Sequence, residues 1–226
     1  MEIVFFKKRV PYAEVDFLFN DVKSKNRNAV DEKIYILEHE NVYTAGKSVL
    51  NNSEELKKKI VDIPVVYSDR GGLWTWHGAG QVIVYFVYDL KKHKKTISDF
   101  MNIIERCVVD VVKNEIVKCG LCGDIDNVFE ITARQDKRGF WCRNLKTGDV
   151  AKFGFIGLRV KNGFVIHGIS VNYSNDLFYF DFINPCGLGD VKITSIKEIV
   201  GDVGEKHLNI KVFKRTLGKA LFETLS

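Results

Sequence analysis

In the second half of the sequence, Cys186, Lys152 and His167 are candidates for nucleophilic or acid–base chemistry. Cys186 follows a proline and precedes a glycine in FINPCGLGD, so we expect its thiol to be presented on a turn. A thiol reacts as the thiolate, which a nearby cation such as Lys152 could stabilise. As a neutral amine, the same lysine could act as a base. Their spacing in the sequence does not show whether they meet in the fold.

A β-hairpin is predicted to carry the lysine and the histidine. Asn162-Gly163 is the dipeptide that best tolerates the positive φ angles of a two-residue type I′ turn. The flanking runs are AKFGFIGLRVK and FVIHGISVNY, and the expected pairs are Leu158 with His167, Ile156 with Ile169, and Lys152 with Tyr173. Strict alternation puts Lys152 and His167 on one sheet face, unless a β-bulge intervenes. The apolar neighbours expected on that face are Ile156, Leu158, Ile169 and Val171.

Both side chains also have ordinary structural interpretations. A lysine on an apolar strand face commonly extends its amine to water, and a histidine is more often a hydrogen-bonded structural residue than a catalytic one. Alternatively, the lysine lies beside a group that needs a proton donor or a positive charge. The residue types alone leave these alternatives open.

The stretch DRGGLWTWHGAGQVIVY, residues 69–85, places four glycines next to a histidine, a glutamine and two tryptophans. Such a cluster can be a set of turns that require positive φ, or it can bring bare backbone close to another group. Strands are expected on both sides, at residues 64–68 and 81–88, so the glycine segment is predicted to be a loop anchored at both ends.

Periodicity indicates helices and strands in mixed order. Apolar residues recur at helical spacing from Val15 to Val22, behind Pro11, and KIYILEHE has the character of a strand. The clearest helix is predicted to start with Ser98 as its N-cap and to bury a stripe made of Phe100, Ile103, Ile104, Cys107, Val108, Val111 and Val112. A terminal helix buries Phe213, Leu217, Ala220, Leu221 and Leu225. Hairpins without regular βαβ alternation indicate an α+β fold.

We expect the cysteines to be reduced thiols and not disulfides. Their number, five, is odd, and we expect a cytoplasmic protein. Cys119 and Cys122 form one Cys-x-x-Cys pair, whereas a structural zinc site needs four ligands. We favour a turn after a helix for this pair over a metal or redox site. Cys107 is expected in the core.

Composition predicts one domain spanning residues 1–226. The chain is 46% hydrophobic, and no linker or repeat divides it. Its longest apolar run, Val82 to Tyr88, is too short to cross a bilayer, and MEIVFFKKR does not resemble a secretory signal, so no membrane contact is expected. The net charge of +5 favours acidic partners, and no nucleic-acid-binding signature is present, so we expect no nucleic acid partner.

Four ordered blocks resemble the octanoyl-[acyl-carrier-protein]:protein N-octanoyltransferases, also called lipoyl(octanoyl) transferases. They are LEHENVYTAG at 37–46, RGGLWTWHGAGQVIVY at 70–85, KFGFIGLRVKNGFVIHGISVNY at 152–173 and NPCG at 184–187. The resemblance covers the middle two-thirds of the chain. It implies one α+β, two-layer domain like the catalytic domain of lipoate and biotin protein ligases, with a mixed sheet packed against helices.

The resemblance also implies a reaction. Cys186 would accept an octanoyl group from octanoyl-acyl carrier protein as a thioester, with Lys152 as its catalytic partner. The acceptor would be a lysine of lipoyl domains of 2-oxoacid dehydrogenase E2 subunits or of the glycine cleavage H protein. This is the first step of endogenous protein lipoylation, and it needs no metal or cofactor.

The family's acyl-binding segments map onto three stretches of this sequence. These are Arg70, Gly71, Gly72, Leu73, Trp74, Thr75, Trp76 and His77; Phe155, Ile156 and Gly157; and Gly168, Ile169 and Ser170. Ser170 stands where alanine is expected, and Glu40-Asn41 where a proline often occurs. Both departures affect details of pocket shape and loop rigidity.

Acyl transfer gives the glycine segment a physical purpose. Tetrahedral oxyanions are stabilised by fixed N–H donors, and glycines let the backbone approach the reacting carbon. We expect Gly71, Gly72, Gly78 and Gly80 to provide that access and His77 to be a polar anchor. Apolar side chains including Trp74, Trp76 and Ile156 would line an acyl slot, in which some six methylenes contribute roughly 5 kcal/mol.

Two alternatives remain at the level of the sequence. A lipoate or biotin protein ligase would activate a free acid with ATP and Mg²⁺, and would need no nucleophilic thiol. A non-catalytic module would only bind a carrier or lipoyl domain. NPCG counts against the ligase, and the intact pair of Cys186 and Lys152 counts against the module.

Overall fold

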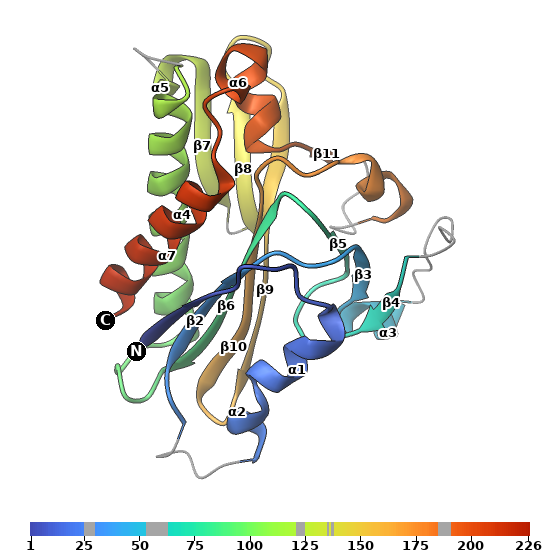
Figure 1. Ribbon diagram of the computed structural model, residues 1–226, viewed down its shortest axis with the longest axis vertical. Helices are drawn as coiled ribbons and strands as arrows, with labels where there is room; N and C mark the ends of the chain where they lie inside the picture. The colour runs from blue at the N-terminus through green and yellow to red at the C-terminus, as the bar shows by residue number, and fades with distance from the viewer. Residues whose placement is uncertain (25–29, 53–62, 121–124, 135, 137, 185–190) are drawn as a thin grey trace.

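The computed structural model describes residues 1–24, 30–52, 63–120, 125–134, 136, 138–184 and 191–226 (Figure 1). Within these residues the main sheet has the order β1-β2-β6-β10-β9-β8-β7, and β11 pairs with β9. The strands are β1 (Glu2–Phe5), β2 (Lys33–Leu37), β6 (Gln81–Asp89), β7 (Phe129–Arg134), β8 (Gly139–Asn144), β9 (Val150–Lys161), β10 (Phe164–Asn172) and β11 (Lys192–Ile193). Pairs β1–β2 and β9–β11 are parallel and the others are antiparallel, so the sheet is mixed as expected.

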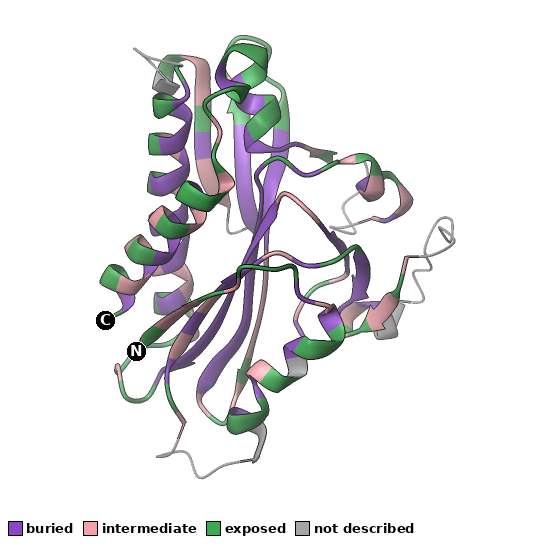
Figure 2. Ribbon diagram, viewed as in Figure 1, coloured by how far each residue is buried: buried purple, intermediate pink, exposed green. Residues whose placement is uncertain are grey.

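Helices cover one face of this sheet. They are α4 (Ile97–Lys118), α6 (Ile196–Glu205) and α7 (Ile210–Leu225), with α4 and α7 lying side by side in Figure 1. Their inward sides are buried and their outward sides exposed (Figure 2). The predicted stripes of α4 and α7 are confirmed, because their residues belong to or pack against the largest apolar cluster.

The predicted N-cap of α4 is wrong by two residues. Thr96, not Ser98, caps the helix, because its hydroxyl accepts a hydrogen bond from Asp99 N while the Asp99 carboxylate accepts one from Thr96 N. This reciprocal capping box satisfies two backbone donors that a lone serine would not.

A smaller sheet has the order β4-β3-β5, and its tryptophans pack in one apolar cluster with Phe155 of β9. Its strands are β3 (Val42–Ala45), β4 (Val65–Tyr67) and β5 (Trp74–His77). The prediction that the whole glycine segment is a loop is therefore wrong for its centre. Trp74 and Trp76 are buried on one side of β5, and this alternation of large aromatic residues favours a strand even between glycines.

Short helical elements connect these strands. They are η1 (Tyr12–Glu14), α1 (Val15–Leu18), α2 (Asn20–Ser24), α3 (Lys47–Asn52), α5 (Ile125–Val128) and η3 (Phe178–Phe182). The apolar run from Val15 to Val22 is thus split between two helices, but Val15, Phe19 and Val22 are buried as expected. The η3 turn packs on β5, where Tyr179 and Phe180 contact Trp76.

The β9–β10 hairpin has the predicted register from Lys161–Phe164 to Gly154–Val171, with Asn162 and Gly163 both at positive φ. The ladder does not extend to the expected pair of Lys152 and Tyr173. On the other side of β9, Phe140 pairs with Gly154 but Trp141 pairs with Lys152, which leaves one extra residue in β9. This register shift is a β-bulge at Phe153.

The bulge changes the predicted face of Lys152. Its amine lies over the rings of Trp141 and Phe155, whereas Ile169 and Val171 pack with the helices. The other two expected neighbours, Ile156 and Leu158, also pack against the helix-side cluster. The expectation that the lysine shares a face with these four residues is therefore wrong, because the extra residue reverses the alternation.

His167 also turns to the side opposite to the predicted one. Its φ is +59°, and its ring lies 4.9 Å from that of Phe19 and bonds to Asp69. Positive φ in the middle of a strand breaks the alternation locally, and no simple pattern in the sequence predicts it.

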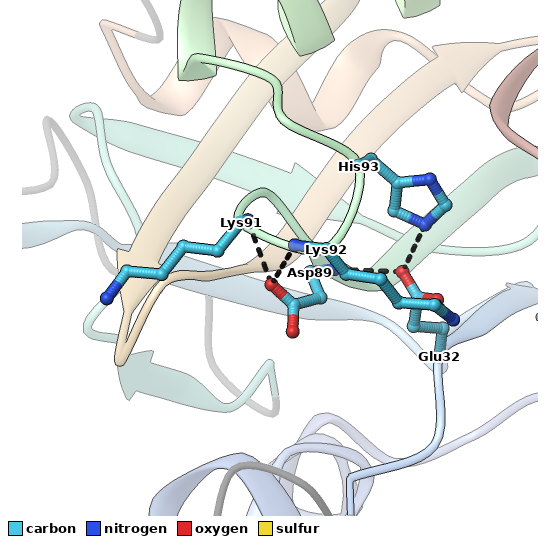
Figure 3. A network of polar contacts seen from close by, with 5 residues as sticks. All are labelled: Glu32, Asp89, Lys91, Lys92 and His93. Carbon is cyan, nitrogen blue, oxygen red and sulfur yellow. Dashed lines mark hydrogen bonds and ion pairs between the residues drawn. The ribbon is translucent and has the colours of Figure 1, made fainter.

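Glu32, next to the start of β2, is hydrogen-bonded to the end of β6 and to the turn that follows it (Figure 3). Its carboxylate accepts hydrogen bonds from Asp89 N at 3.0 Å, Lys92 Nζ at 2.5 Å and His93 Nε2 at 2.8 Å. Burial opposes ionisation of Glu32, but the bonds from Lys92 and the Asp89 backbone outweigh it, so its pKa is lowered. In the described part of the chain, no helix is long and apolar enough to span a membrane.

Candidate active site

A cavity of about 450 Å³ lies between β9, β10 and the segment that leads into β5, a size typical of small-molecule sites. Every residue of the three expected acyl-binding segments lines it except Trp76, and Lys152 lines it as well. The fold therefore brings together stretches that are about 80 residues apart in the sequence. The lining continues past β9 to Ile97 and Met101 at the start of α4.

Lys152 lies in the wall of this cavity and is only 5% exposed. Its Nζ donates a hydrogen bond to Arg138 O at 2.7 Å and lies 5.3 Å from the ring centre of Trp141 and 4.9 Å from that of Phe155. Faces of aromatic rings attract an ammonium group. The amine is thus held in place inside the protein, so the interpretation of a lysine that extends to open water is excluded.

Gly139 makes room for this lysine. A Cβ at this position would clash with Lys152 Cε and Gly154 O, and the φ of +138° is one that other residues rarely adopt. Glycine therefore permits both the backbone conformation and the close approach of the lysine side chain.

Cys186 lies outside the described residues. The described chain stops at Asn184 and resumes at Val191, and two residues later Ile193 pairs with Lys152 in the parallel β9–β11 ladder. Thr194 N also donates to Lys152 O at 2.9 Å. The segment that follows Cys186 in the sequence therefore pairs with the backbone of the lysine predicted to assist it.

The buried Arg70 side chain is hydrogen-bonded to the backbone of the glycine segment. Its side chain donates to Thr44 Oγ1, Thr44 O, Gly71 O and Leu73 O, at distances from 2.8 to 3.1 Å. Burial lowers the pKa of this guanidinium, although arginine stays charged in proteins. Arg70 therefore links the glycine segment, at Gly71 O and Leu73 O, to Thr44 of strand β3.

His77 is a neutral polar residue of the cavity wall. Its Nδ1 lies 2.7 Å from Gln81 Oε1, which can only accept, so Nδ1 carries the proton and donates. Burial, followed by the nearby His39, lowers the pKa of His77 well below its usual value. Gln81 in turn donates to Asn172 Oδ1 at 2.9 Å, which fixes the amide.

The sequence predicts that Gly78, Gly80 and Trp76 line the cavity, but none of the three does. A Cβ on Gly78 would clash with the Trp76 ring, and Gly80 has a φ of +82° against the backbone of Asn175. Trp76 is 1% exposed and stacks on Tyr179 at 4.7 Å. Trp76 packs against Tyr179 and Phe180 of η3, whereas its strand neighbours Thr75 and His77 line the cavity.

Glycine is required at Gly168 for packing. A Cβ there would clash with Val84 O on the neighbouring strand β6. Gly168 pairs with Gly157 across the hairpin, and Gly157 faces the Arg70 side chain. The two glycines therefore let β9, β10 and Arg70 approach closely at the centre of the cavity wall.

Sequence reasoning missed a buried polar network beside the cavity. His39 Nδ1 donates to Val10 O at 2.6 Å, so Tyr85 OH donates to His39 Nε2 at 2.8 Å. Burial lowers the pKa of His39 to about 4 and raises that of Tyr85 well above its usual value, so both are neutral. Tyr12 stacks on His77 at 6.0 Å. The partners are too far apart in the sequence for spacing to reveal them.

A second missed group anchors the start of the glycine segment. Asp69 bonds to His167 Nε2 at 2.6 Å and forms an ion pair with Arg159. Gly71 N also donates to Leu158 O at 3.3 Å. The segment is thereby fastened to both strands of the hairpin, and His167 has the structural role left open by its residue type.

The cysteines that the structure describes are structural. Cys107, Cys119 and Cys142 are buried, and burial raises the pKa of each thiol, to about 12 for Cys142. Cys122 lies outside the described residues, so the Cys-x-x-Cys pair stays untested. Among the side chains that the structure describes, no cluster of three or more His, Cys, Asp or Glu residues could hold a metal ion.

Solved structures define the class of fold. The chain superposes over its whole length on a putative lipoate protein ligase from T. acidophilum, with a TM-score of 0.65, 14% identity and 85% of that chain covered. Lipoate-protein ligase A bound with ATP gives a TM-score of 0.59 at 12% identity, covering 100% of this chain and 86% of that one. The expected fold class, a mixed sheet packed against helices as in lipoate protein ligases, is confirmed.

Sequence relatives define the family. Residues 12–222 match the lipoyl protein ligase A/B catalytic domain. An octanoyltransferase of Buchnera aphidicola subsp. Schizaphis graminum is 37% identical over 77% of this chain and 72% of the relative. One from Chromobacterium violaceum is 33% identical over 74% of this chain and 71% of the relative. The chain belongs to the lipoyl protein ligase A/B catalytic domain family and, within it, to the octanoyltransferases.

Proposed function

We propose that the protein moves an octanoyl group from octanoyl-acyl carrier protein to a lysine of a lipoyl domain, through a thioester on Cys186. Membership of the octanoyltransferases assigns octanoyl transfer in protein lipoylation. The carrier, the acceptors and the roles of Cys186 and Lys152 are the proposal. The observation that carries it is the buried amine of Lys152 in the wall of a cavity lined by the acyl-binding segments.

In the first half-reaction, the ammonium form of Lys152 stabilises the Cys186 thiolate. The thiolate attacks the carbonyl carbon of the octanoyl thioester, and the tetrahedral intermediate collapses by breaking the bond to the pantetheine sulfur. Lys152 gives its proton to that sulfur, so the carrier leaves as a thiol and the lysine becomes a neutral amine.

In the second half-reaction, the neutral amine acts as a base. It removes a proton as the acceptor lysine amine attacks the acyl-enzyme, an amide forms, and Cys186 leaves as a thiolate beside the restored ammonium. Protons and charge balance within the pair, so the proposed cycle requires no metal, nucleotide or other cofactor.

The acceptors proposed are the lipoyl domains of 2-oxoacid dehydrogenase E2 subunits and the glycine cleavage H protein. The net charge of +5 supports attraction of the acidic carrier, which salt would weaken. We place the reaction in the cytoplasm, where acyl carrier protein and free thiols occur together.

The test is to mix purified protein with octanoyl-acyl carrier protein without ATP and to measure the intact mass. We expect a single octanoyl adduct that hydroxylamine removes. Cys186→Ala should abolish the adduct, while Cys107→Ala, which alters a buried thiol within the α4 stripe, should leave it.

Three outcomes would contradict the proposal. An adduct that persists in Cys186→Ala would place the acyl group elsewhere. Octanoyl transfer that requires octanoate and ATP would favour the ligase chemistry of the structural relatives, and binding of the carrier without any adduct would favour a non-catalytic module.

A further inference from the structure

Among the residues that the structure describes, no strand pairs with one edge of β9 where it passes the cavity. β8 pairs with β9 only from Val150 to Gly154, and β9 continues to Lys161 beside β10 alone (Figure 1). Exposed strand edges present rows of N–H and C=O groups that can pair with another extended chain. The edge lies in the wall of the cavity, which Ile156, Gly157 and Leu158 line.

The ladder geometry shows which residues point their backbone groups away from β10. In an antiparallel pair, alternate residues direct both groups to one side. Gly154 pairs outward with Phe140, and Leu158 O accepts outward from Gly71 N. Ile156 lies two residues from each, so its N–H and C=O also point outward.

The outward groups of Ile156 have no protein partner in the described part of the chain. The hydrogen bonds of its two neighbours on this edge are made by Phe140 and Gly71, which leave Ile156 as a gap between them. Its side chain packs against the helix-side cluster. A backbone donor and acceptor without partners beside a cavity are normally satisfied by water or by ligand.

The gap lies close to the proposed chemistry. Phe155, the residue before Ile156, carries the ring that contacts the Lys152 amine at 4.9 Å. A substrate whose reacting thioester lies at Lys152 therefore has its adjacent atoms near this edge. On the carrier side of the thioester, those atoms are two methylenes followed by the amides of the pantetheine arm.

We propose that the pantetheine arm of the acyl carrier lies along this edge and pairs with Ile156, whose N–H donates to an amide carbonyl of the arm. This inference rests on the proposed function. The two amides of the arm also supply N–H donors for Ile156 O, so one extended ligand satisfies both groups, in the manner of an added strand. The octanoyl chain, which has no amide, occupies the glycine and aromatic side of the cavity.

An alternative use of the Ile156 N–H is to stabilise the oxyanion of the reacting carbonyl. The neighbouring outward C=O argues against it, because a carbonyl oxygen on the same edge repels a developing negative charge. The two uses differ in a measurable way: an oxyanion donor serves every octanoyl thioester, whereas a pantetheine contact serves only thioesters that carry the amides.

The experiment compares acyl-enzyme formation from S-octanoyl-pantetheine and from the amide-free S-octanoyl-mercaptoethanol. An ester replaces the amide between Phe155 and Ile156, which deletes the N–H without changing a side chain. We expect the ratio of kcat/KM for the two thioesters to fall about fivefold, as for loss of one neutral hydrogen bond. The same ester placed before Val160, farther along the edge, is the matched control and should leave the ratio unchanged.

Ile156→Pro provides a second variant, because proline also lacks the N–H and is tolerated on an edge strand that donates nothing to its partner. Ile156→Val keeps the N–H and should retain the wild-type ratio. An unchanged ratio in the ester variant, an equal loss for both thioesters, or an equal effect at Val160 would overturn the inference. Failure of wild-type protein to form any adduct with octanoyl-acyl carrier protein would instead overturn the proposed function.

Discussion

The two faces of β6 differ in what they bury, although they belong to one strand. Val82, Val84 and Phe86 pack into the helix-side cluster with α4 and α7. Ile83 and Tyr85 face the other way and line the cavity, where Tyr85 donates to His39. Because side chains alternate along the strand, one side of β6 is packed against helices and the other side lines a cavity with hydrogen-bonding groups. We propose that the helix face contributes stability, whereas the cavity face positions the reacting groups.

Lys152→Met gives the largest expected effect and tests the cavity face. The change keeps side-chain volume but removes the amine, so octanoyl transfer should fall about 10²–10⁴-fold, as for loss of a general acid and base. Steady-state kcat/KM measures it. Lys161→Met, at the other end of β9, is the control and should retain activity. Full activity in Lys152→Met would remove the functional distinction between the faces.

Phe100→Ala tests the helix face. The Phe100 ring is fully buried and contacts Phe86 at 5.2 Å, so its loss should reduce the free energy of unfolding by about 3–5 kcal/mol. Below the unfolding transition, kcat should stay close to wild type. Denaturant unfolding measures the change, and Phe17→Ala, at a 73% exposed position, should stay within about 0.5 kcal/mol. A loss of kcat without a loss of stability would contradict the assignment of stability to the helix face.

Gly139→Ala and Gly148→Ala form a matched pair that tests how closely the Lys152 amine must be held. Both glycines have positive φ, so alanine brings backbone strain in each case, but only a Cβ at Gly139 would clash with Lys152. Displacement of the amine should lower kcat about 10²-fold in Gly139→Ala. Gly148→Ala should lose some stability and keep its activity. Equal kcat values in the two variants would show that the lysine need not be held so closely.

Glu32→Gln has the smallest expected effect and concerns neither face. Its charge-assisted bonds at the end of the sheet should contribute about 1–3 kcal/mol to the free energy of unfolding. The pKa of Glu32 is lower in the folded chain than its ordinary value of 4.5. These bonds therefore stabilise the fold above that pH, and the stabilisation is lost as the pH falls through the folded-state pKa.

Urea unfolding at pH 7 and at pH 3 measures this contribution. The difference between wild type and Glu32→Gln should be present at pH 7 and shrink at pH 3. A difference that grew on acidification would contradict the lowered pKa.

The sequence predicts the α+β fold, the stripes of α4 and α7, and most of the hairpin register. These features depend on local periodicity and on one Asn-Gly turn, which a single sequence displays directly. It also identifies the segments that line the cavity, through the family resemblance. The parallel pairing of β1 with β2 and the contact of β11 with Lys152 depend on distant segments, so no local pattern predicts them.

The errors have physical causes. One extra residue at Phe153 and a positive φ at His167 reverse the expected faces of Lys152 and His167, and neither has a local signature. Trp76 was expected in the acyl slot because it is aromatic, but alternation within β5 turns it to the other side. Hydrogen bonds between segments far apart, such as Tyr85 to His39, are set by the completed fold alone.

A chase of the isolated acyl-enzyme tests whether Cys186 carries the octanoyl group to the acceptor. Protein acylated by octanoyl-acyl carrier protein is freed of carrier, and its peptides are mapped by mass spectrometry before and after addition of a lipoyl domain. We expect the octanoyl group on Cys186 and its stoichiometric transfer to one lysine of the lipoyl domain without ATP. An octanoyl group on another residue, or one that the lipoyl domain cannot remove, would contradict it.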